Sequence, residues 1–193
     1  QALLVQRAGL ERDYREAAVA VHRVRTTRAA FLSRAVSDLM QVLGMAGGVF
    51  ELRVELDDSS APSRRGDDRL ELLVSANPGF PPGPLRKVAS GGELSRISLA
   101  VKVASAAGQC APTQVFDEVD AGIGGETANS VGRLLKSVAG TGQALCVTHL
   151  AQVAVCADRQ FRVQKSADDQ VTRVQTDLLG ERVRDYSPSL LDQ

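Results

Sequence analysis

The residues with the clearest chemical potential are two adjacent carboxylates, Asp117 and Glu118, which follow the apolar pair at positions 115 and 116. In an open α/β sheet, ligands bind at the carboxyl ends of the strands. There we expect Asp117 to hold Mg²⁺ directly or through water, and Glu118 to polarise an attacking water, a role worth about 10²–10⁴-fold in rate. The alternative is a solvated Asp-Glu pair, and the polar residues at positions 113 and 114 weaken the apolar lead-in.

A second motif is the run Ser90-Gly91-Gly92-Glu93 at the start of a helical pattern. Its pattern is typical of a capping box, in which the Ser90 side chain accepts a hydrogen bond from the amide three residues on and the Glu93 side chain accepts one from the Ser90 amide. The same geometry brings two glycine amides and the positive end of a helix dipole close to an anion such as a phosphate. The two interpretations are compatible.

Two more polar residues stand near strand ends. Asp120 begins a glycine-rich stretch, residues 120–125, which lacks the spacing and context of a dinucleotide fingerprint, and we expect Asp120 to act across an interface. His149 follows the next predicted strand, beside the carboxylate-bearing one. A lone histidine is usually structural, but this position favours a sensor of a γ-phosphate.

Alternating helices and strands must position these motifs. The pattern predicts a helix over 92–107, a strand ending at 116, a helix over 125–138 and a strand over 144–147. Such alternation predicts a parallel sheet covered by helices.

Further strands are predicted before and after the alternating helices and strands of residues 92–147. Period-two alternation over 49–56 and 70–74 predicts two antiparallel strands joined by a polar connection. Residues 77–84 hold four of the seven prolines and form a turn-rich link. Residues 161–164 and 171–178 are predicted edge strands.

The N-terminal segment predicts a long helix, because residues 10–43 contain no Gly or Pro. That stretch would reach about 50 Å. Apolar residues in a partly kept heptad indicate packing on a partner helix: Leu3, Leu10, Ala17, Val24 and Phe31. A cleaner stripe follows near the end of the helix: Leu32, Val36, Leu39 and Leu43.

The same helix is rich in arginine, with seven arginines against three acidic residues over positions 7–34. Five of these arginines are candidate DNA-binding residues: Arg12, Arg15, Arg23, Arg25 and Arg28. A solvated coiled-coil face is at least as good an interpretation.

Composition limits the function classes. Lys+Arg and Asp+Glu number 23 each in 193 residues, so any nucleic-acid contact must be local. The cysteines Cys110, Cys146 and Cys156 suit reduced thiols better than a disulfide framework or zinc site. No signal peptide or membrane-spanning run is visible, so we expect a cytoplasmic protein with no membrane partner. The start at Gln1 suggests an excised piece of a longer protein.

The runs ASGGELSR, VFDEVDAGIGG and CVTHLAQVA, in this order, resemble the C-terminal half of an ABC-type ATPase head of the SMC-like class. Within that class, Ala89-Ser90, GIGG after Asp120 and SANPG at 75–79 most resemble the RecN family of bacterial DNA double-strand break repair proteins. The resemblance covers about residues 50–165. The N-terminal helix fits the returning arm of the family's coiled coil.

The resemblance implies an α/β fold, the C-terminal lobe of an ABC/SMC-type head with a mostly parallel sheet flanked by helices. It divides the chain into a coiled-coil stub (1–46), the head lobe (47–180) and a loose tail (181–193). It also implies roles. Ser90, Gly91 and Gly92 bind the γ-phosphate of ATP held by the opposite head, and Glu93 belongs to the same ATP-binding signature motif. Asp117 is the Walker B ligand of Mg²⁺, Glu118 the general base, Asp120 the D-loop aspartate and His149 the switch histidine.

The implied partners are an N-terminal P-loop lobe of the same protein, a second head in an ATP-dependent homodimer, and DNA at the nucleoid. No G-x-x-x-x-G-K-[ST] motif occurs in the sequence, so we expect the chain alone to bind ATP weakly and not to hydrolyse it. The implied function is ATP hydrolysis that drives a DNA-bridging or DNA-holding clamp in double-strand break repair and recombination.

Three alternatives stand beside this function. A general chromosome-organising SMC protein is disfavoured by the GIGG and SANPG details. A non-catalytic dimerisation lobe would not need both Asp117 and Glu118. A membrane-transporter ATPase would lack the long preceding helix.

Overall fold

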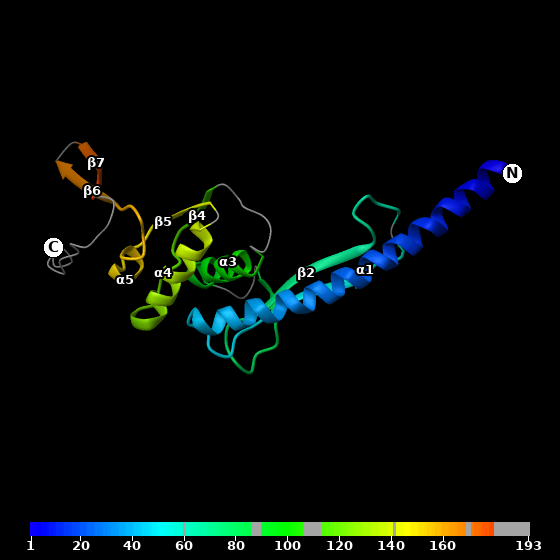
Figure 1. Ribbon diagram of the computed structural model, residues 1–193, viewed down its shortest axis with the longest axis horizontal. Coiled ribbons are helices and arrows are strands. Elements are labelled where there is room, and N and C mark those ends of the chain that lie inside the picture. Colours follow the sequence, from blue (N-terminus) through cyan, green and yellow to red (C-terminus); the bar gives the residue numbers. More distant parts are fainter. Residues whose placement is uncertain (60, 86–89, 106–112, 141, 169–170, 180–193) are drawn as a thin grey trace. The chain divides into compact units, whose positions relative to one another are not determined.

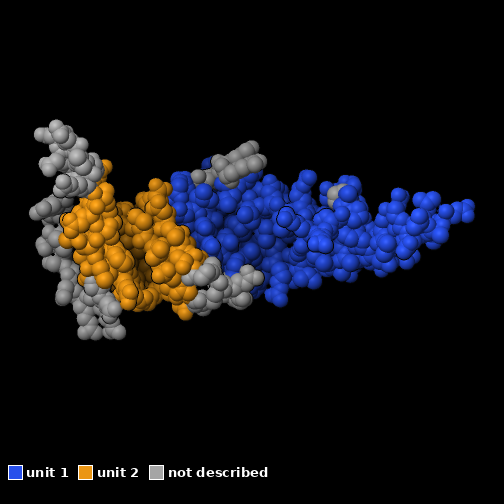
Figure 2. All heavy atoms as spheres, turned by 90° about the horizontal axis from the view of Figure 1, so that it is seen from above, with its two compact units in different colours: residues 1–107 blue, residues 108–193 orange. Residues whose placement is uncertain are grey.

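The computed structural model describes residues 1–59, 61–85, 90–105, 113–140, 142–168 and 171–179 (Figure 1). The chain divides into two compact units, residues 1–107 and 108–193, which Figure 2 colours separately. The predicted tail at 181–193 and the thiol of Cys110 lie outside the described residues.

The first unit begins with the predicted long helix. Helix α1 runs without interruption over Ala2–Val42, which is 41 residues and therefore about 60 Å. It ends shortly before Gly44, which adopts a φ of 80°, and the Met45 amide donates to the Met40 carbonyl at 3.0 Å. This closing pair of features is a Schellman motif, which satisfies carbonyls that the helix leaves without a partner.

Strands β1 (Val49–Leu56) and β2 (Asp68–Ser75) form the predicted antiparallel pair, in register from Val49 opposite Ser75 to Leu56 opposite Asp68. The short strand β3 (Gly83–Pro84) joins the other edge of β2, and helix α3 (Gly91–Ser105) follows. Residues directly opposite in such a pair share one face. The unit is built around a buried apolar core: Val36, Met40, Leu43, Met45, Phe50, Leu73, Val74, Ile97, Leu99 and Ala100.

Helix α1 also satisfies the backbone edge of β1. Three α1 side chains spaced four residues apart bond to every second residue of the edge: Ser33 Oγ accepts from the Leu52 amide (2.8 Å), Ser37 Oγ accepts from the Phe50 amide (2.9 Å), and Gln41 Nε2 donates to the Gly48 carbonyl (2.9 Å). Four helical residues rise about 6.0 Å and two strand residues about 6.6–6.8 Å, so the two repeats nearly coincide. The helix therefore covers an edge that would otherwise be open to pairing with another strand.

The faces of α1 differ from the simplest heptad expectation. The buried positions of the helix are Ala18, Ala29, Val36 and Met40. Of the predicted stripe, Val36 and Leu43 are buried, and Leu32 and Leu39 are half-buried. The heptad seam is exposed in this chain: Leu3 80%, Leu10 64%, Val24 63% and Phe31 70%. A helix that covers this seam therefore stays a prediction.

The second unit contains the predicted helix and strand alternation. Strands β4 (Thr113–Phe116) and β5 (Gln143–Cys146) pair in parallel, which confirms the parallel arrangement of these two strands. Between them, helix α4 (Gly125–Ala139) packs on β5, and helix α5 (Ala151–Ala154) packs on α4.

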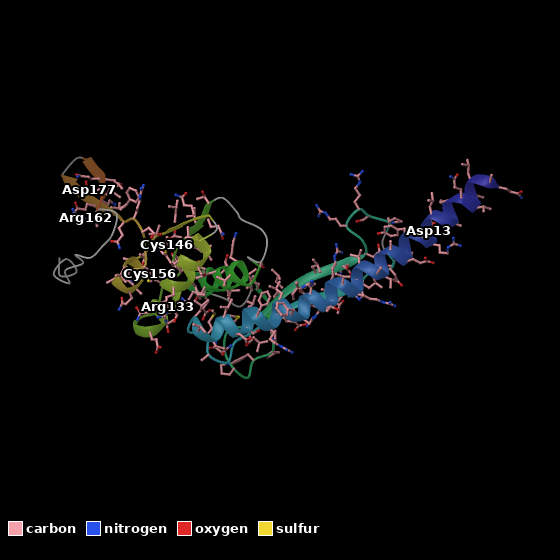
Figure 3. All side chains as sticks on the ribbon, viewed as in Figure 1. Asp13, Arg133, Cys146, Cys156, Arg162 and Asp177 are labelled. Atoms are coloured by element: carbon pink, nitrogen blue, oxygen red, sulfur yellow. The ribbon has the colours of Figure 1, made fainter. Side chains whose placement is uncertain are left out.

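The two strands predicted as edges form a hairpin with each other. Strand β6 (Phe161–Asp168) is longer than predicted and lies antiparallel to β7 (Val171–Leu178). Arg162 and Asp177, labelled in Figure 3, face each other across this hairpin as an ion pair at 3.8 Å.

We expect the substitution Ser37→Ala to lower the free energy of unfolding by about 1–3 kcal/mol, because it leaves the buried Phe50 amide without its acceptor. Urea unfolding followed by circular dichroism measures the change. Thr27→Ala is the matched control, since its exposed hydroxyl donates only to the Arg23 carbonyl of the same helix, and we expect a change within about 0.5 kcal/mol. Equal losses for the two variants would contradict the role assigned to the serine.

Candidate functional site

Helix α3 begins with the predicted capping box. The Glu93 amide donates to Ser90 Oγ at 3.3 Å, and the Ser90 amide donates to Glu93 Oε2 at 3.0 Å. Ser90 and Gly91 are exposed, whereas Gly92 is buried. The capping interpretation is therefore confirmed, and the helix start remains open to solvent, as an anion-binding role requires.

Arg96 lies one turn into α3 and is 6% exposed. Burial lowers the pKa of its guanidinium, and the negative charge of Glu93 partly opposes this effect. No local sequence pattern predicts a buried arginine next to the capping box.

The predicted carboxylates follow β4 directly, and both Asp117 and Glu118 are exposed. Because β4 and β5 are parallel, their carboxyl ends meet at one edge. The Val147 amide donates to the Phe116 carbonyl at 3.0 Å, which continues the pairing one step beyond the strands. The structure thus brings the segment of Asp117 and Glu118 beside the segment that carries His149.

Glu118 has an unusual backbone conformation. Its φ is 57°, and among the residues that the structure describes no other non-glycine residue has a positive φ. The Ala121 amide donates to the Glu118 carbonyl at 3.1 Å and closes the turn. The left-handed conformation costs roughly 1–2 kcal/mol for a residue with a Cβ. Backbone strain of this kind concentrates at functional sites, so it marks Glu118 independently of its side chain.

Asp120 is buried, at 3% exposure, and its Oδ2 atom faces the residues after β5. It accepts hydrogen bonds from Thr148 Oγ1 at 2.5 Å and from the His149 amide at 3.0 Å, and His149 Nδ1 lies 3.2 Å away. Burial alone would raise the pKa of Asp120, but the bonds from Thr148 and His149 outweigh it and hold the pKa below its ordinary value. Asp120 is therefore an ionised carboxylate inside this unit.

The position of α5 depends on a glycine in α4. A Cβ on Gly132 would lie 2.7 Å from Cys156 Sγ and 3.2 Å from the Gln152 carbonyl oxygen, so a larger residue cannot be accommodated without movement. Cys156, labelled in Figure 3, follows α5, and α5 directly follows His149 and Leu150. Close packing at Gly132 therefore helps to seat the segment that carries His149.

Cys146 and Cys156 are free and partly buried, as expected for reduced thiols. Burial raises the pKa of Cys146 to about 11, with smaller contributions from the negative charges of Asp120 and Asp117. The Cys146 thiol, at the end of β5 (Figure 3), therefore stays protonated near neutral pH beside these carboxylates.

The chain is 44% identical to the DNA repair protein RecN of Xylella fastidiosa (strain Temecula1 / ATCC 700964) over 171 residues, which are 89% of this chain and 31% of the relative. It is 45% identical to RecN of Vibrio cholerae over 82% of this chain and 28% of the relative, and 50% identical to RecN of Streptomyces coelicolor over 66% and 23%. The chain belongs to the RecN family. It spans about a third of the length of the curated relatives that it matches first.

Solved SMC heads share the fold. The Smc head domain with an extended coiled coil from Pyrococcus furiosus, bound to the C-terminal domain of ScpA, matches with a TM-score of 0.55 and 26% identity over 81% of this chain and 36% of that chain. The Smc head with a coiled coil and joint from Pyrococcus yayanosii matches with a TM-score of 0.55 and 26% identity over 79% and 27%. No protein-family model matches the chain. The expected α/β fold of an SMC-type head is thus confirmed for this RecN-family chain.

In this RecN-family chain, the arginine-rich face of α1 is partly neutralised. Asp67 and Asp68 have side chains that are 1% exposed, and they pair with Arg15 and Arg25 respectively, the second pair at 2.9 Å. Arg12 pairs with its neighbour Asp13. Among the predicted DNA-binding residues, Arg23 and Arg28 are exposed and make no ion pair within the described residues.

The two aspartates fasten the end of the β1–β2 connection and the start of β2 to α1. Tyr14 donates its hydroxyl to Asp67 Oδ1 at 2.5 Å, and His22 Nδ1 lies 2.6 Å from Asp68 Oδ1. Burial alone would raise the pKa of Asp68, but hydrogen bonds from Arg25 and His22 outweigh it and lower the pKa. Sequence patterns offered no signal for this contact, whose partners are more than 40 positions apart.

We expect Asp68→Asn to lower stability at pH 7 by about 1–3 kcal/mol, because an ionised acceptor of two hydrogen bonds is lost. The lowered folded-state pKa means that the ionised carboxylate stabilises the fold above its unfolded value of 3.8, and that this stabilisation disappears as the pH falls further. The stability difference between the variant and the parent should therefore shrink below pH 3.8. Urea unfolding between pH 7 and pH 3 measures it, with the exposed Asp58→Asn as control, and a pH-independent difference would refute the explanation.

Proposed function

We propose that this chain is the C-terminal lobe of an ATP-hydrolysing head that dimerises around ATP and drives a DNA-bridging or DNA-holding clamp in double-strand break repair and recombination. The observation that carries this proposal is the meeting of Asp117, Glu118 and His149 at the carboxyl ends of two parallel strands. Kinship with RecN proteins and the fold of SMC heads support it. The protein would act in the cytoplasm, at the nucleoid.

Glu118 is the proposed general base. Its carboxylate is exposed and its strained backbone holds it in a turn closed by the Ala121 amide. It would accept a proton from the water that attacks the γ-phosphate, while His149 would contact the phosphate that becomes more negative. Such positioning and electrostatic effects provide most of the catalysis in phosphoryl transfer.

Asp117 is the proposed Mg²⁺ ligand. The described residues contain no cluster of three or more potential metal ligands. Mg²⁺ commonly takes one or two carboxylates and completes its shell with water and phosphate oxygens, so a single exposed carboxylate fits an ion that arrives with ATP. Bound Mg²⁺ would neutralise charge on the phosphates.

The start of α3 is the proposed contact to the nucleotide of a second head. Ser90, Gly91, Gly92 and Glu93 form a capped helix start with an exposed serine and glycine, which suits a phosphate held from outside. The phosphate-binding loop that completes each ATP site would come from an N-terminal lobe, because the sequence contains no G-x-x-x-x-G-K-[ST] motif.

The chain on its own should therefore not hydrolyse ATP at a measurable rate, and a protein that joins it to a RecN-family P-loop lobe should. In that two-lobed protein we expect Glu118→Gln to lower kcat about 10²–10⁴-fold. Glu126→Gln, an exposed carboxylate in the first turn of α4, is the matched control and should leave kcat unchanged. Steady-state phosphate release measures both, and full activity of Glu118→Gln would overturn the proposal.

The variant Glu118→Gly separates chemistry from strain. Because it removes the carboxylate, it should be as inactive as Glu118→Gln. Because glycine adopts a positive φ without strain, it should also resist urea better than Glu118→Gln does. If the lobe only dimerises and takes no part in catalysis, ATP turnover by the two-lobed protein should be the same with and without either variant.

DNA contact on α1 is proposed at Arg23 and Arg28, because Arg15 and Arg25 already pair with buried aspartates. We expect the double variant Arg23→Glu and Arg28→Glu to weaken DNA binding and to flatten its salt dependence. Arg64→Glu, an exposed arginine in the β1–β2 connection, is the control for charge. Fluorescence anisotropy at several salt concentrations measures the binding. If the double variant keeps the salt dependence of the parent, Arg23 and Arg28 do not contact DNA.

A further inference from the structure

We infer that Asp120 is a positioning residue for His149: its carboxylate holds the Thr148–His149 backbone in place and keeps a proton on Nδ1 of the imidazole, leaving Nε2 as the nitrogen available to a ligand. This inference deepens the proposed function and rests on it for its catalytic meaning. The structural part can be tested without ATP.

The contacts of one oxygen carry the argument. Asp120 Oδ2 accepts from the Thr148 hydroxyl and the His149 amide, and lies 3.2 Å from His149 Nδ1. An ionised carboxylate 3.2 Å from Nδ1 attracts a proton on that nitrogen and repels the lone pair that an unprotonated Nδ1 would present, so the contact favours the proton on Nδ1. The Asp120 side chain is 4% exposed, and water therefore offers little competition for this oxygen.

The histidine needs such a partner. Its side chain is 72% exposed, and without the Asp120 carboxylate beside Nδ1 the ring would be free to change rotamer and tautomer. Thr148 adds a second fixed point, because its hydroxyl donates to Asp120 and accepts from the Leu150 amide at 3.1 Å. The loop after β5 is thus held at two successive residues by one carboxylate from the loop after β4.

The chemical consequence concerns Nε2. With the proton on Nδ1, a neutral ring presents Nε2 as an acceptor, and a protonated ring presents an Nε2–H donor to a phosphate oxygen. In both states the Asp120 carboxylate faces a protonated Nδ1. In metal sites, partners of this kind fix the orientation and tautomer of the ligating histidine, and their loss commonly reduces metal affinity or activity 10–100-fold. We expect a loss of similar size for His149.

The direct test is the tautomer of His149. The chain contains two histidines, His22 and His149, so long-range ¹H–¹⁵N spectra of the whole labelled chain can assign both. At pH 8 we expect the Nδ1–H tautomer for His149, and in Asp120→Ala a shift to the Nε2–H tautomer that predominates in free histidine. Unshifted amide signals of α4 and β5, which lie in the same unit as Asp120, report that this unit stays folded in the variant.

Two further variants keep this test decisive. Asp158→Ala removes an exposed carboxylate that pairs with Lys136 and should leave the His149 tautomer unchanged. Thr148→Val keeps the carboxylate, so the tautomer should persist while the His149 amide exchanges with solvent about tenfold faster. A parent protein with the Nε2–H tautomer, or an unchanged tautomer in folded Asp120→Ala, would overturn the inference.

Activity in the two-lobed protein provides the second readout. Asp120→Ala should lower kcat about 10–100-fold with little change in KM for ATP, and Asp120→Glu should recover part of the loss. If Glu118→Gln stays active, the proposed function fails whatever the tautomer shows. If Glu118→Gln is inactive but Asp120→Ala keeps full kcat, the positioning role fails and the proposed function stands.

Discussion

The parallel pairing of β4 and β5 is the constraint on which the candidate site depends. Two parallel strands end at the same edge, and the bond from the Val147 amide to the Phe116 carbonyl extends their alignment into the loops. Residues 31 positions apart, Glu118 and His149, are thereby brought to one edge. An antiparallel arrangement would place the two loops at opposite ends, and neither the Asp120 contacts nor a shared phosphate site could form.

Buried carboxylates hold each unit together by the same physical balance. Desolvation disfavours the charge of Asp120 and of Asp68, and in each case several hydrogen-bond donors reverse the effect. At Asp120 the donors come from the loop of Thr148 and His149, and at Asp68 they come from Arg25 and His22 on α1. Because an unpaired buried charge is strongly destabilising, each carboxylate specifies where its segment of the chain must lie.

Much of this architecture could be predicted from local patterns. The capping box at Ser90, the antiparallel pairing of β1 and β2, and the long N-terminal helix depend on residues close in sequence or on strict periodicity. The order of the motifs was enough to indicate the family. These features share one property, which is that neighbouring residues determine them.

The rest depends on contacts between distant segments. Ser33 and Ser37 are ordinary helix residues until β1 lies beside them, and Arg15 and Arg25 count as basic surface until buried aspartates neutralise them. The positive φ of Glu118 likewise has no local signature, since glutamate has no preference for it. Counting charges along α1 therefore overestimates the positive potential of the folded helix.

Burial of Asp120 also limits what the loop after β4 can do. The resemblance to SMC-like heads implies a role for this residue across an interface between heads, whereas here the carboxylate is enclosed and bonded to Thr148 and His149. A second head could reach the carboxylate only if those bonds opened, and each costs about 1–3 kcal/mol when a buried partner is left unsatisfied. In one conformation Asp120 can serve His149 or a partner head, but not both, so a contact with the partner would have to replace the lost bonds.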